Sequence, residues 1–185
     1  MKEIKIIGRG GQGGKTAAEI IAKIGLNEGK FIQSFPEYGA ERQGAPVFAY
    51  TRISDEEITI HSDVKNPDII AIIDPTLIIP KMVEGIKSDG ILIVNTNKTS
   101  DEVRDHLKLK LKDIYTVDAT SISIKYLGKN IPNTPMLGAI STATGLFSLK
   151  DVEEEIKHKF LKKIGPEFTK KNIDSIREAS KEVKQ

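Results

Sequence analysis

The sequence contains no cysteine and no tryptophan, and only three histidines. The absence of cysteine excludes disulfides, a thiolate nucleophile and the usual ligand sets of iron–sulfur clusters and structural zinc. The histidines have neither a paired acid nor a second histidine at helical spacing, so we predict no metal site and no catalytic histidine. We assign no catalytic residue, and we expect other proteins to carry the electrons in any redox reaction that this chain supports.

Neither charge nor hydropathy is strongly biased. Lysine and arginine number 28 against 26 aspartates and glutamates, and this net charge of +2 is too small to indicate nucleic acid or an anionic membrane as partner. No apolar run approaches membrane-spanning length, and the N-terminus shows no leader pattern, so we expect a cytoplasmic protein. With 185 residues, 38% of them hydrophobic, we predict a single domain over 1–185, with a C-terminal helical extension over about 148–185.

Short apolar segments alternate with segments of helical spacing, as is typical of an α/β fold. A first strand is predicted at 4–7 and ends in glycines. Apolar residues at helical spacing follow it and predict a helix, and a second strand is predicted at 31–35. Near-continuous apolar runs are expected of parallel strands covered on both faces, and the strand candidates of the second half are 69–73, 91–94 and 114–117. Alternation over 47–53, resumed through Ile58 and Ile60, predicts a β-hairpin that turns at 54–56.

Capping residues and glycines set the bounds of the predicted helices. Asp74 and Pro75 open a helix that Gly85 closes, with Pro80 as a kink or early stop. The other helices are predicted at 119–127, ended by Gly128; at 134–146, capped by Thr134 and Pro135; and from 149, behind a capping box of Ser148 and Asp151. The predicted fold is α/β: a mostly parallel layered sheet with an antiparallel hairpin, helices on both faces and a helical C-terminus.

Glycines follow the first strand at a spacing that suits a phosphate. They satisfy G-x-G-x-x-G between a strand and a helix, where backbone amides would face a phosphate at the helix N-terminus. The candidate binding residues of this loop are Gly8, Gly10, Gly11, Gln12 and Gly13. A dinucleotide site also needs an acidic residue near the end of the second strand, and Glu37 is the nearest. A free-standing dinucleotide-binding regulator is therefore one alternative function.

Two other interpretations of the glycine loop stay open. The stretch nearly matches a P-loop, because it ends in Gly14-Lys15-Thr16 and because Asp74 follows an apolar strand, as a magnesium-linked aspartate does. The spacing differs, since the pattern needs a glycine where Arg9 stands, but a P-loop-like ATPase remains an alternative. In the third interpretation the glycines only form a tight turn, no ligand binds, and Lys15 is an exposed helix residue.

Further candidates lie in a charged loop over 36–46 and at a later helix start. In the loop, glycine and proline fix the positions of Glu41 and Arg42, which would face another subunit or a phosphate or acyl group, or would pair with each other. The remaining candidates are Glu37, Tyr38, Asn133 and Thr134. Capping accounts for the last two, although a helix start can also face a ligand.

Over its whole length the chain resembles the gamma subunits of 2-oxoacid:ferredoxin oxidoreductases. Four features occur in the order typical of that family: the loop Gly10–Gly13, the loop Tyr38–Pro46, the turn Asn66–Asp68 and the segment Ile131–Ala139. The Ala45-Pro46 ending and the segment Asn133–Met136 are similar to the pyruvate type rather than the 2-oxoglutarate type. The chain is therefore identified as a member of the pyruvate:ferredoxin oxidoreductase group of this family.

The resemblance implies a multisubunit enzyme that converts pyruvate, coenzyme A and oxidised ferredoxin to acetyl-CoA, CO2 and reduced ferredoxin. It implies that thiamine diphosphate, Mg2+ and iron–sulfur clusters reside in partner alpha, beta and delta (ferredoxin-like) subunits, that ferredoxin is met through the complex, and that coenzyme A is a substrate. No cofactor is expected on this chain alone. Its implied role is to complete the assembly and to help shape the coenzyme A site.

Overall fold

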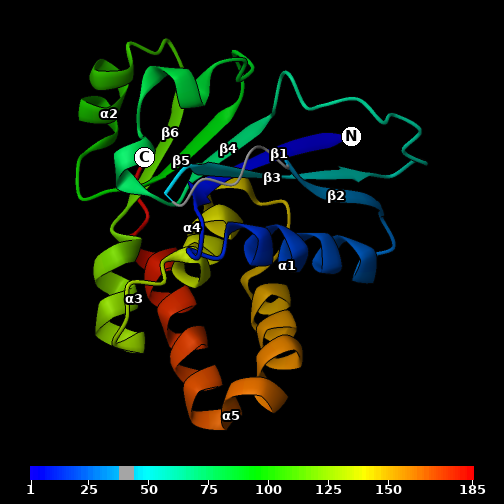
Figure 1. Ribbon diagram of the computed structural model, residues 1–185, viewed down its shortest axis with the longest axis vertical. Coiled ribbons are helices and arrows are strands. Elements are labelled where there is room, and N and C mark those ends of the chain that lie inside the picture. The colour runs from blue at the N-terminus through cyan, green and yellow to red at the C-terminus, as the bar shows by residue number, and fades with distance from the viewer. Residues whose placement is uncertain (38–43) are drawn as a thin grey trace.

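The computed structural model describes residues 1–37 and 44–185 and contains a six-stranded mixed sheet with helices on both faces (Figure 1). The strands lie in the order β2-β3-β1-β4-β5-β6. Their bounds are β1 Lys2–Arg9, β2 Phe31–Glu37, β3 Pro46–Ser54, β4 Ile69–Ile72, β5 Ile91–Asn95 and β6 Asp113–Val117. Parallel pairing joins β1, β4, β5 and β6, which confirms the predicted class of sheet.

The antiparallel hairpin is present, but the position predicted for it is wrong. Strand β3 pairs antiparallel with β2 on one side and with β1 on the other, whereas residues 57–60 form no strand. The buried guanidinium of Arg52 explains the difference, because it donates to the carbonyls of Ile60 and Ser62 at 3.3 and 2.6 Å. The segment that follows β3 is thus held by a side chain instead of by a ladder of backbone hydrogen bonds.

Each face of the sheet buries its own core, because side chains of successive strand residues point to opposite faces. One face, with Ile4, Ile6 and Ala71, packs against α1 Gly14–Asn27, α3 Ala119–Leu127, α4 Asn133–Thr144 and α5 Leu149–Glu182. The other, with Ile70 and Ile72, packs against α2 Ser100–Leu107 and two short 3-10 helices, η1 Pro75–Leu77 and η2 Pro80–Val83. Helices on both faces were predicted, and the structure confirms them.

The connection after β4 corrects the predicted helix over 74–85. Asp74 does cap it, accepting from the Thr76 backbone at 2.8 Å, but only the two 3-10 helices form. Pro80 is the cause: it donates no backbone hydrogen bond and holds the preceding residue, Ile79, in an extended conformation. Helix α2 was not among the predicted helices; it is short and buries only Val103 and Leu107.

The C-terminal helix α5 begins behind the predicted Ser148 and Asp151 capping box and is two arms joined by a kink. Gly165 has φ 78° and ψ 168°, and Pro166 follows it, so the first arm runs away from the sheet and the second returns (Figure 1). Arg177 of the second arm donates twice to Glu153 of the first, each at 2.7 Å. None of the helices in the described part of the chain has the length and apolar composition of a membrane span.

Helix α4 crosses the returning arm of α5 at Gly138, where the backbones touch. A methyl group on Gly138 would overlap the carbonyl oxygen of Ile176. We predict that Gly138→Ala lowers the free energy of unfolding by about 2 kcal/mol, because neither backbone can move without disturbing its own helix. Urea unfolding of the isolated subunit measures this, and Gly10→Ala, which meets no atom within 4 Å, is the control. An equal, small effect of both variants would contradict the close approach.

Candidate functional site

The candidate site lies at the carboxyl edge, the edge of the sheet where β1, β4, β5 and β6 end. The chain leaves β1 into α1, which covers one face, and leaves β4 into η1, which covers the other. Such a reversal between neighbouring parallel strands opens a crevice at their carboxyl ends, where open α/β sheets bind ligands. The glycine loop after β1 and Asp74 after β4 stand on the two sides of this crevice.

The glycine loop is a tight turn held by its own glutamine. The Gln12 backbone donates to the carbonyl of Arg9 at 3.2 Å, and the Arg9 backbone donates to Gln12 Oε1 at 2.7 Å. Gly13 has φ 78°, and a Cβ there would overlap the amide of Asn133. Helix α1 begins directly after Gly13 with no side-chain cap, so its first backbone amides are available at the crevice. The loop therefore needs glycine for conformation and for close packing.

Asp74 is the buried charge of the site, with 6% of its surface exposed. Its carboxylate accepts from Gln12 Nε2 at 2.5 Å and from the backbone and hydroxyl of Thr76. Burial raises the pKa of the Asp74 carboxyl, but the hydrogen bonds from Thr76 and Gln12 and the charge of Arg9 together outweigh burial, so the pKa lies below its ordinary value. The sequence pattern around Asp74 predicts a helix cap or a P-loop aspartate and does not indicate its pairing with Gln12.

Arg9 connects three segments of the site. Its guanidinium lies 3.5 Å from Asp74 Oδ2 and donates to Thr76 Oγ1 at 2.7 Å. It also donates to the carbonyl of Gly44, in the part of the charged loop that the structure describes. The loop thus returns to the sheet at the glycine loop, a contact that sequence reasoning missed because Arg9 counted only as a departure from the P-loop spacing.

Among the candidates outside the glycine loop that the structure describes, Asn133 is the one that contacts this loop. Its Nδ2 lies 3.4 Å from the carbonyl oxygen of Gly13, and its Oδ1 is buried with no hydrogen-bond partner in the described residues. The predicted capping role is wrong, because α4 begins at Asn133 behind Pro132 and no side chain caps it. Thr134 is buried in the first turn of α4 and likewise caps nothing. An unpaired acceptor of this kind is costly, and a ligand donor would satisfy it.

Glu37 is not placed at the glycine loop. Glu37 ends β2, is exposed, and accepts from the hydroxyl of Tyr50 at 2.5 Å. Burial and that hydrogen bond raise the pKa of Tyr50. Tyr38, Glu41 and Arg42 lie outside the described residues. Glu37 therefore has a structural partner of its own.

The topology argues against a dinucleotide site. In such folds the acidic residue follows the strand that neighbours the first one, whereas here β3 lies between β1 and β2. Glu37 is thus displaced by one strand from where a ribose would be held.

The P-loop alternative also lacks its geometry. Lys15 is exposed and lies 4.0 Å from Glu19, one turn along α1, instead of turning back over the loop. Asp74, the residue expected to serve magnesium, is occupied by Gln12 and Thr76. Among residues 1–37 and 44–185, no group of three or more Asp, Glu, His or Cys side chains is placed to hold a metal ion.

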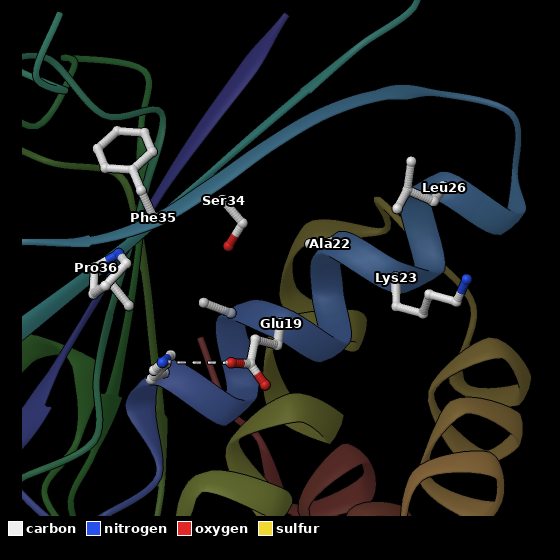
Figure 2. A pocket seen from close by; sticks show the side chains of 10 residues that line it. Glu19, Ala22, Lys23, Leu26, Ser34, Phe35 and Pro36 are labelled. Carbon is white, nitrogen blue, oxygen red and sulfur yellow. Dashed lines mark ion pairs between the residues drawn. The ribbon is translucent and has the colours of Figure 1, made fainter. Parts of the chain in front are cut away.

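A shallow groove of about 230 Å³ runs along α1 beside β2 (Figure 2). Ala22, Leu26 and Phe35 contribute apolar surface, and Lys15, Glu19 and Lys23 supply charge at its rim. Its polar groups do not converge on one point, so we interpret it as a contact surface instead of a reaction site.

Comparison with known proteins places the chain among oxidoreductase subunits. Residues 3–182 match the family described as Pyruvate ferredoxin/flavodoxin oxidoreductase. The chain is 46% identical to pyruvate synthase subunit PorC of Thermotoga maritima, over 98% of this chain and 94% of that protein. It is 46% identical to the pyruvate/ketoisovalerate oxidoreductases common subunit gamma of Thermococcus litoralis, over 97% and 95%. The crystal structure of pyruvate oxidoreductase subunit PORC from T. maritima has a TM-score of 0.88 at 43% identity, over 99% and 97% of the two chains.

The pairing of Gln12 with Asp74 generates a pH-dependent prediction. Gln12→Glu would place a carboxylate against a buried carboxylate, so we expect the free energy of unfolding at pH 7 to fall by about 2 kcal/mol. Because the pair then has a raised pKa in the folded state, most of this loss should be recovered by pH 4.5 as one carboxyl takes up a proton. Urea unfolding at both pH values measures it.

The matched control for this prediction is Gln185→Glu. Gln185 also donates to a carboxylate, that of Asp113 at 2.7 Å, but at the exposed surface. Solvent should screen the repulsion there, so stability should change little at either pH. In the wild type the pH dependence runs the other way. Because the pKa of Asp74 is lowered in the folded state, its carboxylate adds to the free energy of unfolding at neutral pH, and this addition is lost below about pH 4. Equal losses for Gln12→Glu at pH 7 and pH 4.5 would contradict the contact.

Proposed function

The chain belongs to the pyruvate ferredoxin/flavodoxin oxidoreductase family as a gamma-type subunit, and we propose that it completes a multisubunit pyruvate:ferredoxin oxidoreductase and shapes its coenzyme A site. The reaction converts pyruvate, coenzyme A and oxidised ferredoxin to acetyl-CoA, CO2 and reduced ferredoxin. Two features support a subunit role. The chain has no cysteine to bind iron–sulfur clusters, and the relatives that it matches over nearly their whole length are named as subunits. Thiamine diphosphate, Mg2+ and the clusters then belong to alpha, beta and delta partners in the cytoplasm.

The observation that carries the coenzyme A role is the unpaired acceptor of Asn133 beside the uncapped start of α1. Coenzyme A offers both phosphates and the N–H and O–H donors of its pantetheine arm. Backbone amides at the start of a helix suit a phosphate, and a buried amide oxygen suits an N–H or O–H donor. The role of this chain is to bind and orient that substrate.

The choice of 2-oxoacid is assigned to other subunits. Relatives with the same 46% identity to this chain are named for pyruvate alone in one case and for pyruvate and ketoisovalerate in the other. A subunit that serves both substrates in one relative does not itself select between them. We propose pyruvate for this chain because Ala45-Pro46 and Asn133–Met136 resemble the pyruvate type.

The assembly is tested by oxygen-free affinity purification of the tagged chain from its native host. We expect thiamine-binding and cysteine-rich subunits to co-elute, identified by mass spectrometry, together with pyruvate oxidation that depends on coenzyme A. Omission of coenzyme A and replacement of pyruvate by 2-oxoglutarate are the controls. A lone chain without this activity would contradict the assignment.

The coenzyme A role is tested by Asn133→Leu, which keeps the branched shape of the side chain and removes the unpaired oxygen together with the 3.4 Å contact to the carbonyl of Gly13. We expect the isolated subunit to be stabilised by about 1 kcal/mol, because a buried unsatisfied group is lost. In the complex we expect the KM for coenzyme A to rise about tenfold with kcat little changed, because a binding contact is lost. Thr142→Ala, on the exposed side of α4, is the control. Unchanged kinetics would show that Asn133 does not meet the substrate.

A further inference from the structure

The kink of α5 has a high local density of positive charge. We call residues 157–171 the hairpin tip; it contains six lysines and one glutamate. Its formal charge is therefore +5, whereas the whole chain carries only +2, so the rest of the chain is −3. In Figure 1 this part of α5 lies farthest from the sheet. A small net charge thus conceals a strong local separation of charge.

Most of these lysines are not neutralised within the described residues. Lys159 lies 2.8 Å from Glu19 of α1, and Lys171 lies 2.8 Å from Glu167. The remaining four lysines are exposed, and no described carboxylate lies within ion-pair distance of them: Lys157, Lys162, Lys163 and Lys170. Concentrated like charge repels itself, so its presence on one short hairpin calls for a partner of opposite charge.

The same tip exposes apolar side chains. Leu161 and Ile164 are 48% and 42% exposed, whereas the other apolar residues of α5 are buried or partly buried. Between the two arms is a groove of about 280 Å³, to which Leu161, Pro166 and Ile173 contribute apolar surface. The cations of Lys157, Lys170 and Arg177 also line it. Apolar surface flanked by cations matches a segment that has apolar and acidic side chains.

These features favour a polypeptide over the other anions that lysines attract. A nucleic acid or a lipid headgroup presents phosphates and would leave the apolar groove unused. The arms are fixed by Arg177 to Glu153 and by Lys125 to Glu178, so the groove is preformed.

We propose that the hairpin tip docks an acidic segment of another subunit of the same complex, with one apolar side chain of that segment entering the groove between the arms. This inference rests on the proposed function, because it takes its partner from the multisubunit assembly. The charges steer the association and set its orientation, and the apolar contact slows dissociation.

The direct test is carbodiimide cross-linking of the purified complex, which joins a lysine amine to a carboxylate that it touches. We expect mass spectrometry to find Lys162, Lys163 or Lys170 joined to aspartate or glutamate of another subunit. A complex whose cross-links all avoid the hairpin tip would overturn the docking proposal alone. The absence of any co-purifying subunit would contradict the proposed function, and the docking proposal with it.

Charge reversal supplies the second test. Lys162→Glu with Lys163→Glu should weaken association with the remaining subunits on the order of tenfold at low salt, with a smaller difference at high salt. Lys110→Glu with Lys112→Glu makes the same charge change at exposed positions outside the hairpin and should have little effect. Equal effects of both pairs would contradict the proposal, as would loss of phosphatidylserine vesicle binding by the first pair with subunit association unchanged.

Discussion

The buried carboxylate of Asp74 is the contact on which the carboxyl edge depends. Removing a charge from water costs several kcal/mol unless hydrogen bonds replace the lost hydration. Gln12 and Arg9 supply that replacement from the glycine loop after β1, and Thr76 supplies it from the segment after β4. The glycine loop is therefore held at the end of β4 by the need to satisfy one charge, and Arg9 brings Gly44 to the same place.

The groups that hold the glycine loop in place differ from those that stay unpaired at the crevice. The side chain of Gln12, a candidate binding residue, hydrogen-bonds within the protein, whereas the start of α1 and Oδ1 of Asn133 have no side-chain partner among the described residues. Asn133 is held there by the close approach of α4 to α5 at Gly138. The long C-terminal helix thus positions the site from one side while its charged tip extends away from the sheet (Figure 1).

The sequence predicts the class of fold because apolar runs mark the strands buried on both faces, and because glycine and capping residues act locally. The prediction from sequence fails where a contact between residues far apart in the chain determines the local structure. Ile58 and Ile60 alternate like a strand, but Arg52 binds the carbonyls of that segment instead. Asn133 resembles a cap, yet it faces a loop 120 residues earlier in the chain. Local patterns carry no information about such pairs, so the site was predicted as separate motifs and not as a network.

The most direct test of the coenzyme A site is hydrogen exchange of the intact, oxygen-free complex with and without coenzyme A. We expect coenzyme A to slow amide exchange in this chain at residues 10–16 and 133–137, where the start of α1 meets Asn133, and to change exchange in α2 little. Unchanged exchange at both segments, while partner subunits become protected, would show that coenzyme A does not contact this chain.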